Sequence, residues 1–212
     1  MVELSGVSFG YQSDKNVLDN LNLRMEEGRF YGLLGMNGSG KTTLLKLIAG
    51  KLFAHGGEIY VDGRNLRERD VETLQKVFML PADFIFPNMS LEQFLAIYSE
   101  FYPEFRKEVL NDCLVNFEIQ RDIKNLNQLS LGEKHKVAFS IALSLGTKIV
   151  LLDEAANGMD IPARKMFRKL LMKHVREDQI VVLSTHIVQD IENLLTDVIV
   201  LRKDAPVYAA SL

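Results

Sequence analysis

Residues 35–43 read Gly-Met-Asn-Gly-Ser-Gly-Lys-Thr-Thr and carry the clearest chemistry in the chain. An apolar run at 30–34 before them predicts a buried strand, and residues 44–49 after them follow a helical pattern. A glycine-rich loop in this position can hold nucleotide phosphates, because its N–H groups and the start of the helix dipole converge on an anion. Lys41 can then reach the terminal phosphates, and the hydroxyl of Thr42 can bind Mg²⁺.

Two acidic residues, Asp153 and Glu154, follow a strand predicted at 148–152. Open α/β sheets bind ligands at the carboxyl ends of their strands, so Asp153 can bind Mg²⁺ through water while Glu154 polarises an attacking water. Such a pair can equally cap the next helix, but the phosphate loop upstream favours the functional interpretation. His186 follows a strand predicted at 179–183 and can hydrogen-bond a γ-phosphate, although a loop histidine is the simpler alternative for that residue alone.

The segment Leu129-Ser-Leu-Gly-Glu133 precedes a predicted helix. Ser130 at the N-cap and Glu133 at the third helical position form the pattern of a capping box. Ser130 and the backbone around Gly132 also lie where a helix N-terminus meets an anion. The residues alone favour the capping interpretation. Tyr11, upstream of the phosphate loop, can stack on adenine, but the residue by itself favours an ordinary tyrosine at a strand end.

The composition is that of a globular chain that can bury a core. Its 212 residues are 47% hydrophobic and 25% charged, and the net charge of −3 gives no reason to expect nucleic-acid binding. Cys113 is the only cysteine, so an intrachain disulfide is excluded and a reducing, cytoplasmic setting is expected. We expect no signal peptide, and no apolar run reaches the ~20 residues that a membrane span requires.

The order of the patterns predicts an α/β fold with a mainly parallel sheet and helices on both faces. Further strands are predicted at 2–9, 18–24, 58–61, 77–80 and, as the last strand, 198–201, with helices at 163–175 and 187–195. Residues 84–145 show helical spacing only. We therefore expect a single domain over 1–212, with an α/β core at 1–83 and 146–212 and an inserted helical subdomain at 84–145.

These motifs, in this order, resemble the ATP-binding cassette (ABC) family over essentially the whole chain. The resemblance rests on the loop at 35–43, the signature-like segment 129–133, Leu-Leu-Asp-Glu at 151–154, Ala-Asn-Gly-Met-Asp at 156–160, and His186. It implies a P-loop NTPase core with an N-terminal antiparallel β subdomain, and an ATPase that uses ATP and Mg²⁺. Family members close as head-to-tail dimers over two ATP molecules, and hydrolysis reopens them.

The resemblance also implies partners and a location. A second ABC ATPase subunit, as in a homodimer, and a separate integral membrane permease would bind this chain at the cytoplasmic face of a membrane. The chain would then power transport, while the permease would determine the substrate. Around Asn157-Gly158 and Phe101-Tyr-Pro103 the sequence is similar to ATPases of bacterial ABC-2-type exporters.

By this resemblance, individual residues acquire roles. Glu154 is the catalytic base, His186 contacts the γ-phosphate, and Asp160 ends a loop that links the two ATP sites. Thr42 and Asp153 bind Mg²⁺. The ATP-binding residues are Tyr11, Asn37, Gly38, Ser39, Gly40, Lys41, Thr42 and Thr43. The signature residues that face the ATP of the second subunit are Ser130, Gly132 and Glu133.

Three positions depart from the family pattern. Ala82 follows Leu-Pro where a glutamine is usual, although Asp83 is adjacent; Leu131 replaces a glycine and Glu133 a glutamine of the signature. These departures keep alternatives open: a non-transport ABC ATPase, or a switch subunit that binds ATP but hydrolyses it poorly. A small-molecule P-loop kinase is disfavoured by the signature segment and by His186.

The region 82–104 offers aromatic side chains for a docking surface. Phe84, Phe86 and Phe94 can anchor a permease, or they can fill the core of the helical subdomain. The sequence leaves these two roles equally open.

Overall fold

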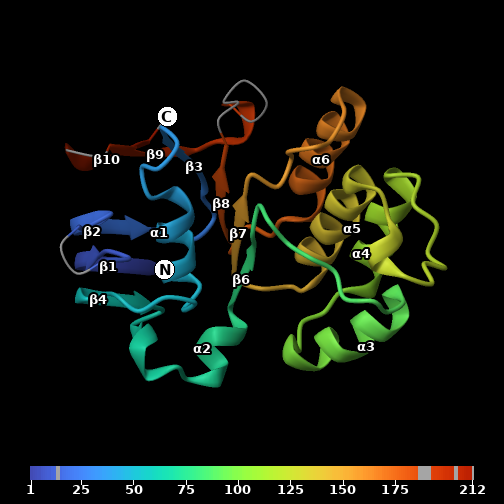
Figure 1. The fold of residues 1–212 in the computed structure, drawn as a ribbon, viewed down its shortest axis with the longest axis horizontal. Helices are drawn as coiled ribbons and strands as arrows, with labels where there is room; N and C mark the ends of the chain where they lie inside the picture. The colour runs from blue at the N-terminus through green and yellow to red at the C-terminus, as the bar shows by residue number, and fades with distance from the viewer. Residues whose placement is uncertain (13–14, 186–191, 203–204, 212) are drawn as a thin grey trace.

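The computed structural model describes residues 1–12, 15–185, 192–202 and 205–211 and contains two β-sheets with helix α1 between them (Figure 1). The strands are β1 (Val2–Phe9), β2 (Leu18–Met25), β3 (Phe30–Gly35), β4 (Gly56–Val61), β5 (Arg64–Asn65), β6 (Val77–Leu80), β7 (Ile149–Asp153), β8 (Ile180–Ser184), β9 (Asp197–Arg202) and β10 (Ala205–Ser211). The α-helices are α1 (Lys41–Ile48), α2 (Val71–Gln75), α3 (Leu91–Phe101), α4 (Lys107–Asn116), α5 (Leu131–Ser144) and α6 (Ile161–His174).

The larger sheet has the strand order β10-β9-β3-β8-β7-β6 and is parallel except for β10, which pairs antiparallel with β9. The smaller sheet, β2-β1-β4-β5, is antiparallel throughout. These two sheets confirm the predicted fold class. The prediction of 198–201 as the last strand is wrong, because β10 follows it. The sequence of β10 contains Pro206 and several alanines and therefore lacks a strand pattern. Proline is tolerated in β10 because this strand lies at the edge of the sheet and pairs only with β9.

The parallel sheet is buried on both faces, and its side chains alternate between two cores. On β7, Ile149 and Leu151 pack in the core that includes α1 and the antiparallel sheet, while Val150 and Leu152 pack in the core that includes α5 and α6. Burial on both faces explains why these strands read as continuous apolar runs in the sequence. The parallel sheet therefore separates the α1 side from the helical side of the molecule.

Residues 84–145 contain α3, α4 and α5, as their helical spacing predicts, and these helices lie on the right of Figure 1. Within the part of the chain that the structure describes, no helix is long and apolar enough to cross a membrane. Cys113 of α4 is buried and unpaired, and burial raises the pKa of its thiol to about 12. The thiol is therefore protonated and unreactive at neutral pH.

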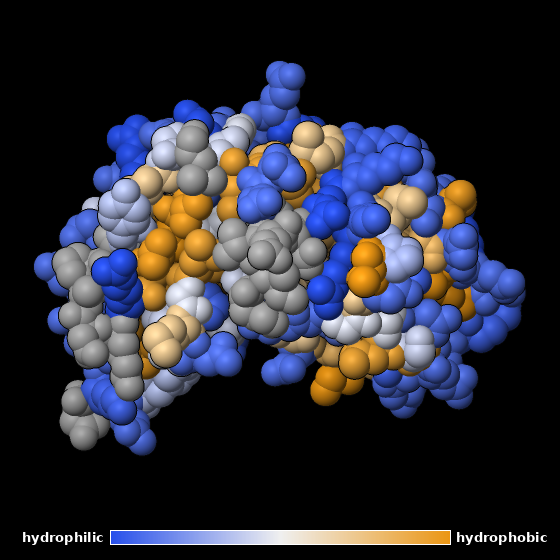
Figure 2. Space-filling view, turned by 90° about the horizontal axis from the view of Figure 1, so that it is seen from above, coloured by the Kyte–Doolittle hydropathy of each residue, from blue (hydrophilic) through white to orange (hydrophobic). Residues whose placement is uncertain are grey.

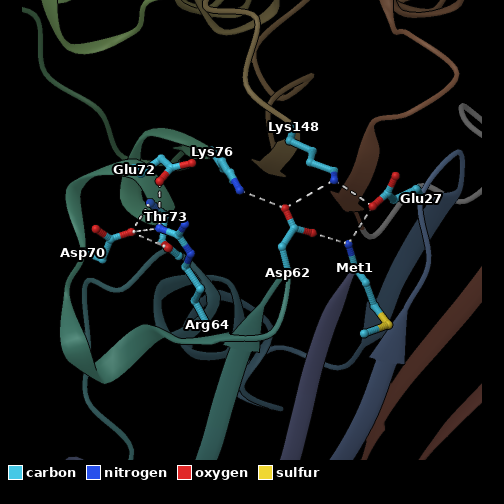
Figure 3. A network of polar contacts seen from close by, with 9 residues as sticks. All are labelled: Met1, Glu27, Asp62, Arg64, Asp70, Glu72, Thr73, Lys76 and Lys148. Carbon is cyan, nitrogen blue, oxygen red and sulfur yellow. Dashed lines mark hydrogen bonds and ion pairs between the residues drawn. The ribbon is translucent and has the colours of Figure 1, made fainter.

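A network of ion pairs ties the antiparallel sheet to the parallel sheet (Figure 3). The carboxylate of Asp62, after β4, accepts hydrogen bonds from the α-amino group of Met1 at 2.8 Å, from Lys76 at 3.2 Å and from Lys148 at 3.3 Å. Lys148 also pairs with Glu27 at 2.7 Å. Burial raises the pKa of Asp62, but these donors outweigh burial and hold the pKa at about 2. Lys76 and Lys148 directly precede β6 and β7, so the network links both sheets.

Asp62→Asn should lower the free energy of unfolding by about 1 kcal/mol at neutral pH, because the amide keeps the shape but loses the charge. The folded pKa lies below the ordinary 3.8, so this stabilisation is complete above about pH 4 and is lost as the pH falls through about 2. Urea unfolding of parent and variant, at neutral pH and near pH 2, measures the difference. Asp122→Asn, in an exposed pair with Lys124, is the control and should have little effect. Equal losses of unfolding free energy in both variants would show that the Asp62 network does not stabilise the fold.

Candidate functional site

The glycine-rich loop turns tightly between β3 and α1. Gly38 and Gly40 have φ angles of +79° and +99°, in the left-handed region that side chains with a Cβ rarely adopt. The N–H group of Ser39 donates to the carbonyl of Met36 at 3.1 Å and closes the turn. Asn37 is exposed at its tip. The loop therefore leads directly into α1, which begins at Lys41, so the N-terminus of this helix faces the loop.

Two polar side chains of the loop are poised for an anion. The Lys41 ammonium is buried and donates to the carbonyls of Gly35 at 2.8 Å and Met36 at 3.2 Å. The hydroxyl of Ser39 is buried, and no described atom is its hydrogen-bond partner. Phosphate oxygens could accept a hydrogen bond from the Ser39 hydroxyl and could be stabilised by the Lys41 ammonium group and the N-terminus of α1. The residues present therefore fit a nucleotide phosphate chain.

A buried carboxylate joins the phosphate loop to the parallel sheet. Asp153, at the end of β7, is 1% exposed and accepts hydrogen bonds of 2.6 Å from the hydroxyls of Thr42 and Ser184. The Thr42 hydroxyl and the Asp153 carboxylate thus present adjacent oxygen ligands of the kind that Mg²⁺ prefers. Among the described residues no cluster of three or more His, Cys, Asp or Glu side chains could hold a metal. A magnesium ion would therefore also need phosphate oxygens and water as ligands.

No motif in the sequence indicates Ser184 as the partner of Asp153. The signal was present in the strand register, because Asp153 and Ser184 are paired residues at the ends of the neighbouring parallel strands β7 and β8. Both side chains must therefore share one face at the same edge of the sheet.

Glu154 follows Asp153 and is half-buried. Its φ angle of +50° lies in the left-handed region, and its N–H donates to the carbonyl of Ser184 at 3.0 Å. The side-chain amide of Asn157 donates to the Glu154 carboxylate, so the turn that follows β7 holds this carboxylate in place. Strained backbone of this kind is common at active sites, where it fixes the direction of a side chain. Asn157 is a second site residue whose contact with Glu154 no sequence motif indicates.

Tyr11 lies against α1, because its hydroxyl shares a hydrogen bond of 3.2 Å with the hydroxyl of Thr43. Its ring packs edge-to-face on Phe9, with the centroids 5.1 Å apart, and remains 61% exposed. The structure thus brings an exposed aromatic ring next to the phosphate-loop helix. His186 lies outside the described residues, so its contact with a γ-phosphate stays a prediction.

The signature-like segment forms the capping box that its residues predict. The hydroxyl of Ser130 accepts from the N–H of Glu133 at 3.4 Å and donates to its carboxylate at 2.6 Å. This bond from Ser130 lowers the pKa of Glu133. A Cβ built on Gly132 would lie 3.5 Å from the Gly158 carbonyl, so the start of α5 packs on the turn that follows Glu154. Asp160 caps α6 by accepting from the N–H of Ala163 at 2.8 Å.

The parallel strands end, and α1, α5 and α6 begin, on one side of the molecule, at the top of Figure 1. Figure 2 looks down on that side and shows apolar patches among polar residues. Exposed apolar side chains at the starts of these elements are Met36, Leu131 and Ile161, which are 84%, 66% and 71% exposed. This face therefore carries both the nucleotide-site residues and unpaired apolar surface.

The phosphate loop, the Thr42–Asp153 pair and the adjacent Glu154 on a parallel sheet define a P-loop nucleotide-binding domain. A family model described as "ABC transporter" matches residues 18–157. The chain is 30% identical to the ABC transporter ATP-binding protein NatA of Bacillus subtilis, over all of this chain and 90% of NatA. It is also 30% identical to the bacitracin transport ATP-binding protein BcrA of Bacillus licheniformis, over 89% of this chain but only 62% of BcrA.

Solved structures agree with this match. A dimeric ATP-binding cassette in a post-hydrolysis state, bound to ADP and Pi, superposes with a TM-score of 0.85 and 25% identity, over 100% of this chain and 99% of that one. An ATP-binding subunit of an ABC transporter, at 24% identity, superposes with a TM-score of 0.90 over 90% of its length. The chain belongs to the ABC transporter family, in which it is an ATP-binding and ATP-hydrolysing subunit.

Lys41→Ala should weaken ATP binding by roughly ten- to a hundredfold, because it removes a charge-assisted contact worth ~1.5–3 kcal/mol. Titration of ATP into the parent and the variant measures the loss. Lys46→Ala, in the last turn of the same helix, is the matched control and should bind ATP as the parent does. Unchanged affinity in Lys41→Ala would contradict the role of the loop.

Proposed function

We propose that this subunit powers a membrane transporter by closing with a second copy over two ATP molecules, and that Glu154 is the general base. The observation that carries the proposal is the junction at the end of β7. There Asp153 is held by Thr42 of the phosphate-loop helix, and Glu154 directly follows it on a turn fixed by Asn157. This arrangement puts a metal-binding carboxylate and a water-polarising carboxylate next to a phosphate site.

Each residue then has a chemical task. Lys41 and the orphaned Ser39 hydroxyl bind phosphate oxygens, and Tyr11 stacks on the adenine ring. Thr42 and Asp153 hold Mg²⁺, which when bound would neutralise negative charge on the phosphates. Glu154 accepts a hydrogen bond from the attacking water and orients it, while Asn157 keeps the carboxylate in that direction. Positioning and electrostatics of this kind supply most of the catalysis in phosphoryl transfer.

The second subunit would complete the site from α5. Ser130 and Gly132 begin this helix, whose N-terminus attracts anions, and would face the nucleotide of the other copy. Asp160, which caps α6, would lie at the link between the two sites. The exposed apolar side chains Met36 and Leu131 on the same face support this arrangement, because closure would bury them. The dimeric relative bound to ADP and Pi supports it also.

A permease would dock in the aromatic cavity beside α3. This cavity of about 420 Å³ is bounded by β6, the segment after it, α3 and α5. Phe86 and Phe94 are buried in its wall and Phe84 is partly exposed, so the phenylalanines both fill the core and line the cavity. The subunit would then lie at the cytoplasmic face of a membrane. We further propose the division into an α/β core at 1–83 and 146–212 and a helical subdomain at 84–145, which carries the signature.

Glu154→Gln should abolish most hydrolysis while ATP binding persists, because the amide keeps the shape but cannot polarise water. A dimer that forms with ATP should then accumulate, and size-exclusion chromatography with light scattering would show twice the monomer mass. Glu100→Gln on the exposed side of α3 is the control and should hydrolyse ATP at the parent rate. Parent-rate hydrolysis by Glu154→Gln would remove the role assigned to Glu154.

Ala82→Gln tests the departure from the family pattern at the segment after β6. If the missing side chain weakens the site, an added oxygen that can orient the water should raise the hydrolysis rate severalfold. Asp83 lines the aromatic cavity. If Asp83 instead replaces the usual glutamine, Ala82→Gln should do little and Asp83→Ala should lower the rate. Steady-state rates at saturating ATP and Mg²⁺ decide between the two, and equal rates in all three proteins would exclude both.

A further inference from the structure

Ser184 contacts both acidic residues of the site, although the proposed function gives it no task. It ends β8, is 2% exposed, and its hydroxyl donates to Oδ1 of Asp153 at 2.6 Å. Its carbonyl accepts a hydrogen bond from the N–H of Glu154 at 3.0 Å. One residue of β8 thus holds the side chain that is proposed to bind Mg²⁺ and the backbone of the proposed general base.

The two oxygens of the Asp153 carboxylate are held from two directions. The hydroxyl of Ser184, at the end of the sheet, donates to Oδ1, and the hydroxyl of Thr42, in the first turn of α1, donates to Oδ2. The torsion that turns an aspartate carboxylate is soft, so a carboxylate with one donor can rotate about its Cβ–Cγ bond. Two donors fix its plane. Hydrogen-bonding partners of this kind orient the ligands of a metal ion.

The strands determine where this hydroxyl lies. Asp153 and Ser184 are paired residues of the parallel strands β7 and β8, and each continues a row of side chains that faces the core around α1. The apolar residues of these rows are Ile149, Leu151, Ile180 and Val182. A hydroxyl buried at the end of such a row is costly unless it forms a hydrogen bond. Ser184 therefore acts as a fixed donor to Asp153, held by the sheet itself.

We propose that Ser184 is a positioning residue for Mg²⁺: its hydroxyl holds Oδ1 of Asp153, so that Oδ2 stays beside the Thr42 hydroxyl and both oxygens can serve one ion. The inference rests on the proposed assignment of Thr42 and Asp153 to Mg²⁺. The simpler alternative is that Ser184 only satisfies a buried charge and stabilises the fold. A hydroxyl with that role alone would leave the metal affinity of the folded protein unchanged.

Ser184→Ala separates these two roles, because it removes the hydroxyl and keeps the carbonyl that holds Glu154. We expect the Kd for ATP in excess Mg²⁺ to rise about tenfold, the lower end of the usual cost of losing a group that orients a metal ligand. The Kd for ATP in EDTA should stay close to that of the parent. Isothermal titration calorimetry measures both values. Ser184→Thr keeps the hydroxyl, suits a strand and should bind ATP as the parent does under both conditions.

Ser144→Ala is the matched control. Ser144 is also a fully buried serine, but its hydroxyl donates at 2.8 Å to the backbone carbonyl of Ile141 within α5. Its loss can lower the unfolding temperature but should leave both Kd values unchanged. A parent-like Kd in Mg²⁺ for Ser184→Ala would overturn the inference. An equal loss in Mg²⁺ and in EDTA would overturn it too, as would a Ser184→Thr variant as weak as Ser184→Ala.

Two further outcomes keep the test decisive. If Ser184→Ala does not fold, as judged by thermal unfolding, Ser184→Cys replaces it, because a thiol keeps the shape but is a weak donor. If Mg²⁺ tightens ATP binding equally in the parent and in the Ser184 variants, only this inference falls and the proposed function stands. A parent that binds ATP equally well in Mg²⁺ and in EDTA would remove both this inference and the metal site assigned to Thr42 and Asp153.

Discussion

The site depends on one buried carboxylate. Asp153 is 1% exposed, and two hydroxyl donors at 2.6 Å, Thr42 and Ser184, satisfy its oxygens. A buried carboxylate without such partners costs several kcal/mol, so the fold must bring both hydroxyls to it. Thr42 lies in the first turn of α1, and Ser184 ends β8. Satisfying one side chain therefore fixes the phosphate loop relative to the end of the sheet, and Glu154 follows in the next position of the chain.

Most of the fold can be predicted from the hydrophobic patterns and the glycine positions of the sequence. The apolar runs of β3, β7 and β8 are strands buried on both faces, and the loop at 35–43 connects a strand to a helix as its glycines require. The strand β10 escaped prediction because an edge strand needs no strong pattern: it pairs on one side only and tolerates Pro206.

Site residues could be predicted from the sequence where one residue type performs one task, as for Lys41, Thr42 and Asp153. They could not be predicted where the site depends on contacts between segments far apart in the chain. Ser184 required the register of two parallel strands, and Asn157 required the geometry of the turn after Glu154. His135 is buried against Phe84 of a distant segment, and no local pattern in the sequence indicates such a contact.

The two-sided burial of the parallel sheet has a consequence for how the halves of the molecule communicate. Because Ile149 and Leu151 face one core and Val150 and Leu152 the other, the strands separate the core around α1 from the core of the helical side. Changes of packing on opposite faces should act independently. Substitutions on the helical side can therefore adapt that side to a different partner while the phosphate loop keeps its conformation. The two sides also meet at the end of the sheet, where the start of α5 packs on the turn after β7 and Thr42 of α1 donates to Asp153.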